Sequence, residues 1–210
     1  MTTTTTSNTT LGTSLITLQA IAASTTVVGS EADVTGKLSA DIYIHFARTT
    51  TSAPSVGVSF RVESCPVGTG TIGSNAESQW YPEFVYTTGI TAAFSQTPSA
   101  TSGAALTVGA ITNFAAQDVC FVSSSSGSPT LANSEWTRLK SAVSTTMTAE
   151  GSFKNNYASG AIWNKAEIAK LGPIDLSGIS RLRVVVDGSA HNQGFDCEVY
   201  MTTQDSLSTA

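Results

Sequence analysis

The chain has 210 residues, of which 12% are charged and 8% aromatic, and its formal net charge is -5 at pH 7. Thr contributes 32 residues and Ser 29, so 61 of the 210 side chains carry small hydroxyl groups. The sequence has too few clustered Lys and Arg residues for a protein that binds nucleic-acid phosphates, too many apolar residues for an acidic disordered chain, and too few strong helix formers for a helical bundle.

Residues 1–13 are rich in Thr, Ser and Asn, and no core-forming residue precedes Leu11. This composition predicts a flexible or extended arm, and β-branched Thr favours an extended backbone that could add as a strand to a neighbouring subunit. The alternative is simple disorder of the arm in the isolated protein. We find no signal peptide pattern and no segment long enough to cross a bilayer. The predicted organisation is therefore an arm over 1–13 and a single β-sandwich domain over 14–210.

After the arm, apolar residues alternate with polar ones, which is the pattern of half-buried strands. The clearest segment is 37–48, with one apolar face made of Leu38, Ala40, Ile42, Ile44 and Phe46. Segment 56–63 repeats the pattern, and the loop 49–55 predicts a hairpin-like connection between the two. Further predicted strands lie at 119–122 and 136–143. The aromatic segment 79–88 contains Pro82, which places it at a sheet edge or a bulge.

The segment Ile162–Leu171 is the one helix candidate, because it is rich in helix formers and is followed by Gly172 and Pro173. Many short strands with Gly- and Ser-rich turns and at most one short helix indicate an all-β fold. We expect an antiparallel β-sandwich or a jelly-roll-like barrel.

The C-terminal part predicts two strands, Arg181–Asp187 and Phe195–Thr203, joined by the turn-rich segment Gly188–Gly194. Their similar length predicts an antiparallel hairpin. In the second strand, Asp196 and Glu198 alternate with apolar residues and are expected on the outer, solvent-facing side.

Residues for catalysis or metal binding are scarce. The two histidines each lie four residues after an aspartate, as Asp41 and His45 and as Asp187 and His191. Four residues along a strand separate side chains by roughly 13 Å, so neither pair predicts a metal site by itself. No nucleophile motif selects one of the many serines, and the segment Gly68–Gly73 has the G-x-G-x-x-G form without a following helix. We therefore expect no enzyme, no metal and no cofactor.

The cysteines Cys65, Cys120 and Cys197 are far apart and form no C-x-x-C pair. Their setting predicts buried free thiols in a protein made in a reducing cytosol, and one disulfide among the three is the alternative.

Four aromatic residues are candidate interaction residues: Trp80, Tyr81, Tyr86 and Trp163. Together they would form a platform on which a sugar ring stacks. The competing interpretation is that these side chains fill the core or a subunit contact, which is the more common use of large aromatic residues.

The segment Ile174–Asp187 resembles the closing hairpin of small β-sandwich structural proteins of tailed-bacteriophage particles. The Thr-rich arm, the low charge and the Ser-, Gly- and Ala-rich loops are similar to that group as well. The resemblance implies a capsid decoration or cement protein, with a tail-tube or connector subunit as the next member.

If the resemblance holds, the protein is made in the host cytoplasm and assembles onto the virion. Its partners would be the major capsid protein or another virion protein and further copies of itself, for example in a trimer, with no nucleic acid and no membrane. Two other classes stay open. A carbohydrate-binding or adhesin module is motivated by the aromatic residues, and an enzyme only by the serines and the two Asp–His pairs.

Overall fold

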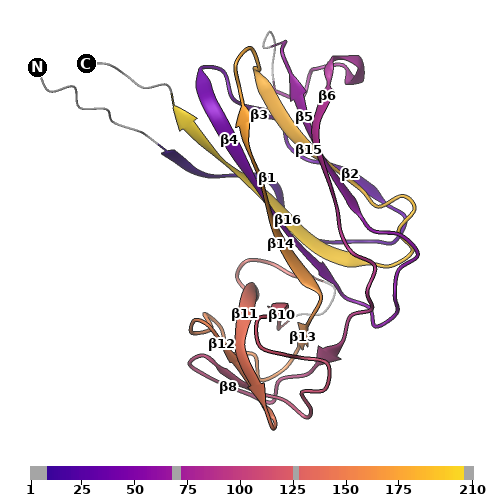
Figure 1. Ribbon diagram of the computed structural model, residues 1–210, viewed down its shortest axis with the longest axis vertical. Helices are drawn as coiled ribbons and strands as arrows, with labels where there is room; N and C mark the ends of the chain where they lie inside the picture. Colours follow the sequence, from indigo (N-terminus) through magenta and orange to yellow (C-terminus); the bar gives the residue numbers. More distant parts are fainter. Residues whose placement is uncertain (1–8, 68–71, 125–127, 206–210) are drawn as a thin grey trace, which may run out of the picture.

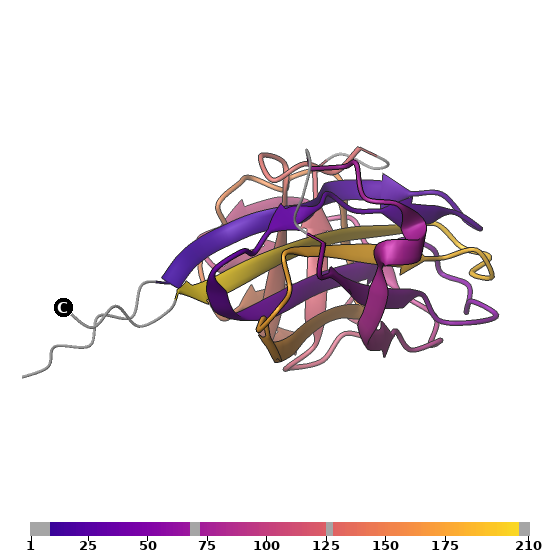
Figure 2. The same cartoon turned by 90° about the horizontal axis from the view of Figure 1, so that it is seen from above.

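The computed structural model describes residues 9–67, 72–124 and 128–205, and these form an all-β protein (Figure 1). Two packed sheets make a sandwich, which we call the body. A further sheet built from residues 90–164 is inserted into the chain between two body strands, and we call it the lobe. Figures 1 and 2 show the lobe stacked against one side of the body.

The body consists of two antiparallel sheets that lie face to face. The first sheet has the order β1 (Thr9–Ile21), β16 (Phe195–Asp205), β4 (Lys37–Arg48) and β14 (Ala166–Asp175). The second has the order β2 (Thr26–Val28), β15 (Arg181–Asp187), β5 (Ser59–Cys65) and β6 (Tyr81–Thr87), and β3 (Ala32–Asp33) also pairs with β15.

The strand pairs of the body are nested. The first strand pairs with the last (β1 with β16), and inside this pair follow β2 with β15, β4 with β14, and β5 with β6. A double ribbon paired in this way and folded into two sheets is the winding of a jelly roll. The predicted all-β antiparallel sandwich is thus confirmed, whereas the alternative of a barrel is not, because the two sheets stay separate within the described ranges.

Apolar side chains from the facing sides of both sheets fill the body core. They include Ile42, Ile44 and Phe46 of β4, Phe60 and Val62 of β5, Val184 and Val186 of β15, and Phe195 and Val199 of β16. The alternation in the sequence predicted the bounds of β4 and β15 correctly. Two inward assignments were wrong, because Leu38 at the start of β4 is 44% exposed and Val56, which precedes β5, is 40% exposed.

The lobe has its own antiparallel sheet and its own hydrophobic core. The sheet order is β7 (Ser95–Gln96), β13 (Ala161–Trp163), β10 (Val119–Ser123), β11 (Ser134–Val143), β12 (Thr146–Ala149), β9 (Ala105–Thr107) and β8 (Ala100–Ser102). Its core consists of Leu106, Val108, Phe114, Cys120, Val122, Leu139, Met147, Tyr157 and Ile162. The predicted strands at 119–122 and 136–143 are β10 and β11. The residues assigned to a single domain over 14–210 therefore hold two separate cores.

The predicted helix Ile162–Leu171 is wrong, because this segment forms β13 and the first part of β14. Lys165, with a φ of 55°, lies between the two strands. Along β14 the chain pairs with β4 from Ala166 onward, and the backbone hydrogen bonds of this ladder outweigh the helix propensity of the residues. The expected stop signal Gly172–Pro173 lies at a register shift inside β14.

Two predicted hairpins are wrong as well. β15 and β16 belong to different sheets, and so do β4 and β5. The connections 188–194 and 49–55 therefore carry the chain from one sheet to the other instead of reversing it within a sheet. The periodicity of a strand reports which face is buried, and it is the same for a hairpin and for a jelly-roll crossing.

Two further predictions concern the edges of the molecule. β6 lies at the edge of the second sheet, as Pro82 predicted. Of the predicted arm 1–13, residues 1–8 lie outside the described residues, while residues 9–13 form the start of β1 and pair with β16. The described part of the chain has one short 3-10 turn, Glu77–Gln79, and holds no helix that is long and apolar enough to cross a membrane.

Candidate functional site

The predicted aromatic platform is divided between different places. Trp80 is only 8% exposed, and its ring lies 4.2 Å from the guanidinium carbon of Arg183. Arg183 in turn pairs with Glu63 at 2.8 Å and with Glu77. Trp80 therefore covers a buried ion network on the outer face of the second sheet, where a sugar ring has no access to its face.

Tyr81 and Tyr86 both lie on β6 but differ in their surroundings. Tyr81 is 56% exposed. The ring of Tyr86 packs against Phe60, and its hydroxyl donates a hydrogen bond of 2.5 Å to Glu167. Only Tyr81 is thus free to contact a partner through its ring.

The edge strand β6 carries an exposed apolar surface. Besides Tyr81, the large hydrophobic residues Phe84 and Val85 of this strand are 41% and 61% exposed. An unpaired sheet edge is a template for pairing with another chain, and folded proteins usually protect such an edge with charges or proline. Here Pro82 is the strand-breaking residue of β6 and Glu83 is its charged residue. We call Tyr81, Phe84 and Val85 the β6 edge patch.

The second structural feature is the seam between body and lobe, centred on the buried residues Leu18, Ala47, Phe121 and Ala166. It covers the outer face of the first body sheet. For this reason Asp196 and Glu198, which the sequence placed on a solvent-facing side of β16, are only 5% and 8% exposed. The expectation that these carboxylates face solvent is wrong.

A row of rings crosses the seam from the body to the lobe. Tyr43 stacks on Tyr200 at 5.1 Å, Tyr200 meets His45 at 5.3 Å, His45 meets Trp136 at 5.3 Å, and Trp136 packs on Phe121 at 4.4 Å. Aromatic pairs at these distances contribute beyond the area they bury. The row therefore fixes the lobe on the outer face of β4 and β16.

His45 and Glu198 form an ion-pairing contact beside this row. The Nδ1 atom of His45 donates to the Glu198 carboxylate at 2.6 Å, and both side chains are nearly buried. They border a cavity of about 540 Å³ that also reaches Trp136, Tyr200 and Lys154. The cavity has the size and the mixture of aromatic and polar walls of a small-molecule site.

A second cavity, of about 370 Å³, opens on the other side of the seam. Its walls come from the end of β1, from β10 and β13, and from the start of β16. Trp163, Phe121 and Asp196 line it. The fourth aromatic residue singled out in the sequence, Trp163, is therefore apart from the other three and belongs to this cavity.

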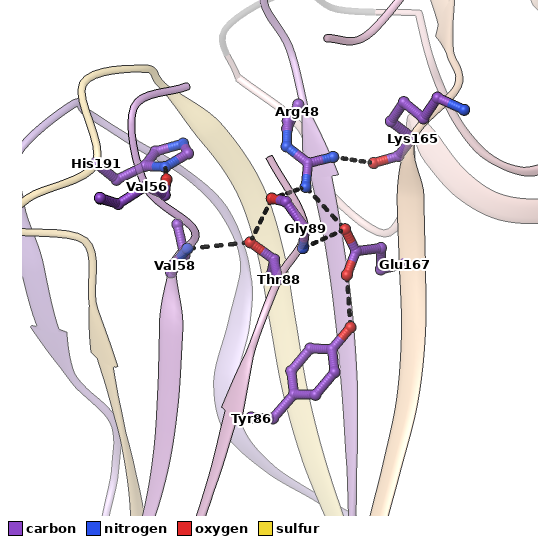
Figure 3. A network of polar contacts seen from close by, with 9 residues as sticks. All are labelled: Arg48, Val56, Val58, Tyr86, Thr88, Gly89, Lys165, Glu167 and His191. Atoms are coloured by element: carbon purple, nitrogen blue, oxygen red, sulfur yellow. Dashed lines mark hydrogen bonds and ion pairs between the residues drawn. The ribbon is translucent and has the colours of Figure 1, made fainter. Parts of the chain in front are cut away.

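A buried arginine holds the two chain segments that connect body and lobe (Figure 3). The Arg48 guanidinium donates to the carbonyl of Gly89, where the chain leaves the body, and at 3.2 Å to the carbonyl of Lys165, where it returns. It also pairs with Glu167 at 2.8 Å, and Glu167 accepts the Gly89 N–H at 3.1 Å. We call Arg48, Gly89, Lys165 and Glu167 the junction clamp.

The two Asp–His pairs do not converge. Asp41 pairs with Lys170 at 3.0 Å, whereas His45 faces Glu198. His191 is buried and donates from Nδ1 to the Val56 carbonyl at 2.6 Å. The described residues contain no group of three or more His, Cys, Asp or Glu side chains arranged for a metal ion. Of the segment Gly68–Gly73, residues 68–71 lie outside the described residues.

All three cysteines are buried and free, as the sequence predicted. Burial raises the pKa of the Cys120 thiol to about 12, and burial also raises the pKa of Cys197. A raised pKa keeps the thiol protonated and unreactive at neutral pH.

We compared the chain with known proteins, and no family model, no curated protein and no solved structure matches it. Sequence reasoning missed the seam, the two cavities and the junction clamp. The one signal that pointed to the seam was the presence of Tyr43, His45 and Tyr200 at positions that alternation assigned to solvent.

Proposed function

We propose that the protein is a non-enzymatic structural subunit of a virion, and specifically a capsid decoration or cement protein that stabilises the particle through subunit–subunit contacts. It would be made in the host cytoplasm, form a homo-oligomer such as a trimer, and bind the major capsid protein or another virion protein. The observation that carries the proposal is the β6 edge patch on a jelly-roll body.

Two physical arguments support this proposal. Jelly rolls are common in viral capsid proteins, although lectins and cupins also use this fold. Exposed apolar side chains on an unpaired edge strand are costly for a protein that stays alone in water, and a neighbouring chain removes that cost. The low charge of the chain also limits repulsion between closely packed copies.

The first test is the oligomeric state of the purified protein, measured by sedimentation velocity over a range of concentrations. We expect an oligomer that Val85→Lys in the β6 edge patch converts to monomers. Val143→Lys is the matched control, because Val143 is 66% exposed on β11 of the lobe and thus similar to Val85 at 61%. A wild-type monomer at every concentration would contradict the proposal.

The second test is quantification of the protein in purified particles of the virus that encodes it. A copy number close to that of the shell protein, in the head fraction, supports a decoration protein. Recovery in the tail fraction at low copy number would instead support the alternative of a tail-tube or connector subunit. Absence from particles would overturn both assignments.

A carbohydrate-binding or adhesin module is the second candidate function, and the 540 Å³ cavity is the observation that favours it. A glycan-array hit that is lost in Lys154→Met and kept in Tyr81→Ala would place sugar binding in this cavity. An array without hits would exclude the module. The predicted platform on Trp80 is no longer part of this candidate, since Arg183 occupies the ring face.

A further inference from the structure

Asp196 lies at the seam, where its carboxylate borders the cavity of about 370 Å³ and has no partner among the described residues. On the sheet it lies between Ala20 of β1 and Ala47 of β4, neither of which has a polar side chain. The residue is 5% exposed, and no hydrogen bond or ion pair reaches its carboxylate from any residue in the described ranges. Glu198, two residues further along the same face, has His45 at 2.6 Å.

Buried carboxylates in folded proteins are normally paired or hydrogen-bonded, because removing such a charge from water is costly. An unpartnered one beside an open cavity therefore indicates that the partner comes from outside the chain. The cavity of about 370 Å³ at Asp196 lies within the size range of ligand sites.

The other walls of the cavity suit a cation. The rings of Phe121 and Trp163 border it, and aromatic faces attract ammonium and guanidinium groups. The hydroxyl-bearing residues Thr49 and Ser123 also line it. The net charge of -5 of the whole chain adds a weak attraction for cations.

A metal ion is a poor occupant for this cavity. Hard divalent cations take about six or more oxygen ligands, and Asp196 is the one carboxylate that lines the cavity. The compact ammonium group of an alkylamine needs fewer partners, and its flexible stem is apolar like most of the walls.

We propose that Asp196, Trp163 and Phe121 form a binding site for a primary alkylammonium group, which is the head of a lysine side chain or of a free amine. The Asp196 carboxylate pairs with the charged nitrogen, and the two rings contact the stem and the nitrogen. The site is independent of the proposed virion role, because it requires no assembled particle.

The test is an NMR titration of the full-length protein with n-butylammonium, with n-butanol as the uncharged control. The titration is run at pH 8, because burial raises the pKa of Asp196 to about 7. We expect saturable shifts of the Trp163 indole N–H signal with the amine and none with the alcohol. Equal shifts with both compounds, or none with either, would overturn the proposal.

Two variants locate the site. Asp196→Asn keeps the shape of the side chain and removes its charge, so we expect the affinity for the amine to fall about tenfold or more. Glu135→Gln, which removes a carboxylate from the other cavity, should bind like the wild type. If Asp196→Asn does not fold, Trp163→Leu is used in its place, and the affinity for the amine is measured from the shifts of the neighbouring backbone amide signals. Unchanged affinity in the variant would refute the site.

A third arm distinguishes the two sources of the ammonium group. The probe is lysine blocked as Nα-acetyl-lysine N-methylamide. Binding at least as tight as that of butylammonium indicates a site for a lysine of a partner chain, whereas weaker binding indicates a free amine. In both cases the expected loss in Asp196→Asn is the same.

Discussion

The Arg48 guanidinium and the Glu167 carboxylate meet at 2.8 Å at the point where the chain passes between body and lobe (Figure 3). Arg48 is 1% exposed and also donates to the carbonyls of Gly89 and Lys165. One side chain thus binds a carbonyl group on each of the two segments that lead to the lobe and also pairs with one carboxylate. A charge that is buried in this way is tolerated because both terminal nitrogens of the guanidinium have partners, although its Nε atom has none among the described residues, and it becomes costly when a partner is lost.

Replacement of this arginine tests the junction clamp. Arg48→Met leaves two carbonyl groups without their donor and the charge of Glu167 without its cationic partner, so we expect a loss of about 3–5 kcal/mol in the free energy of unfolding. Lys140→Met is the control, since Lys140 is exposed on β11. The measurement is urea denaturation followed by tryptophan fluorescence. Equal stability of the two variants would show that the clamp has no energetic role.

The covered ring of Trp80 gives the second prediction. Trp80→Ala removes a buried ring and exposes the Arg183 network, and we expect a loss of about 3–5 kcal/mol, as for other large-to-alanine changes in cores. Tyr81→Ala, at the neighbouring but exposed position, should change stability by less than about 0.5 kcal/mol. Thermal unfolding of both variants checks this. Unchanged stability of Trp80→Ala relative to the wild type would mean that packing of the Trp80 ring does not stabilise the fold.

Local periodicity predicted much of the fold, because an inward face of alternating apolar residues is a property of one strand. The segment 37–48 is the example, since its bounds match β4. The secondary-structure prediction failed where residues far away in the sequence determine the conformation of a segment. Ala166–Asp175 contains good helix formers, yet it forms a strand because it pairs with β4 through backbone hydrogen bonds. Nothing within the segment itself indicates this pairing.

The burial of Asp196 at the seam could not be predicted from the alternation of apolar and polar residues, for a related reason. Alternation shows which face of β16 points into the sandwich, but the burial of Asp196 on the other face depends on a lobe that is contributed by residues 90–164. A long insertion between β6 and β14 is visible only once the pairing of β14 with β4 is known. The partners of Arg48 depend on the same crossing of the chain.

The burial of the three thiols predicts that they react slowly with thiol reagents in the native protein. With Cys65, Cys120 and Cys197 all buried, and with the pKa of Cys120 at about 12, we expect almost no reaction of the native protein with Ellman's reagent at pH 8. In denaturant without reductant all three thiols should react at once. Release of one equivalent under those conditions would instead reveal a disulfide and contradict the free thiols.

The raised pKa of Asp196 predicts a pH dependence of stability. Burial raises this pKa from 3.8 to about 7, so the folded protein holds the proton more tightly than the unfolded chain. Its contribution to stability is full below about pH 4 and falls as the pH rises to about 7, by about 2–4 kcal/mol in all.

The comparison of wild type with Asp196→Asn isolates this effect from the other carboxylates. The variant should gain stability relative to the wild type between pH 4 and pH 8, with most of the gain reached near pH 7. Urea denaturation at a series of pH values measures the difference. A difference that stays constant with pH would mean that Asp196 titrates normally in the folded protein.

Deletion of the lobe tests whether the body folds alone. Gly89 and Lys165 both contact the Arg48 guanidinium, so a linker of about three residues, which spans roughly 10 Å, can replace residues 90–164. We expect the shortened chain to keep a β-type circular dichroism spectrum and cooperative unfolding, because the body core contains no residue of the lobe.

The same deletion also exposes the apolar residues of the seam, so the experiment needs a control for aggregation. Leu18 and Ala47 lose their cover, so the deletion is made with and without Leu18→Ser to separate aggregation from misfolding. Asp196 regains water as well, and its pH-dependent contribution to stability should disappear. If both shortened chains are unfolded while the full chain is stable, the body and lobe form one cooperative unit, and the sequence-based prediction of a single domain over 14–210 is the correct description.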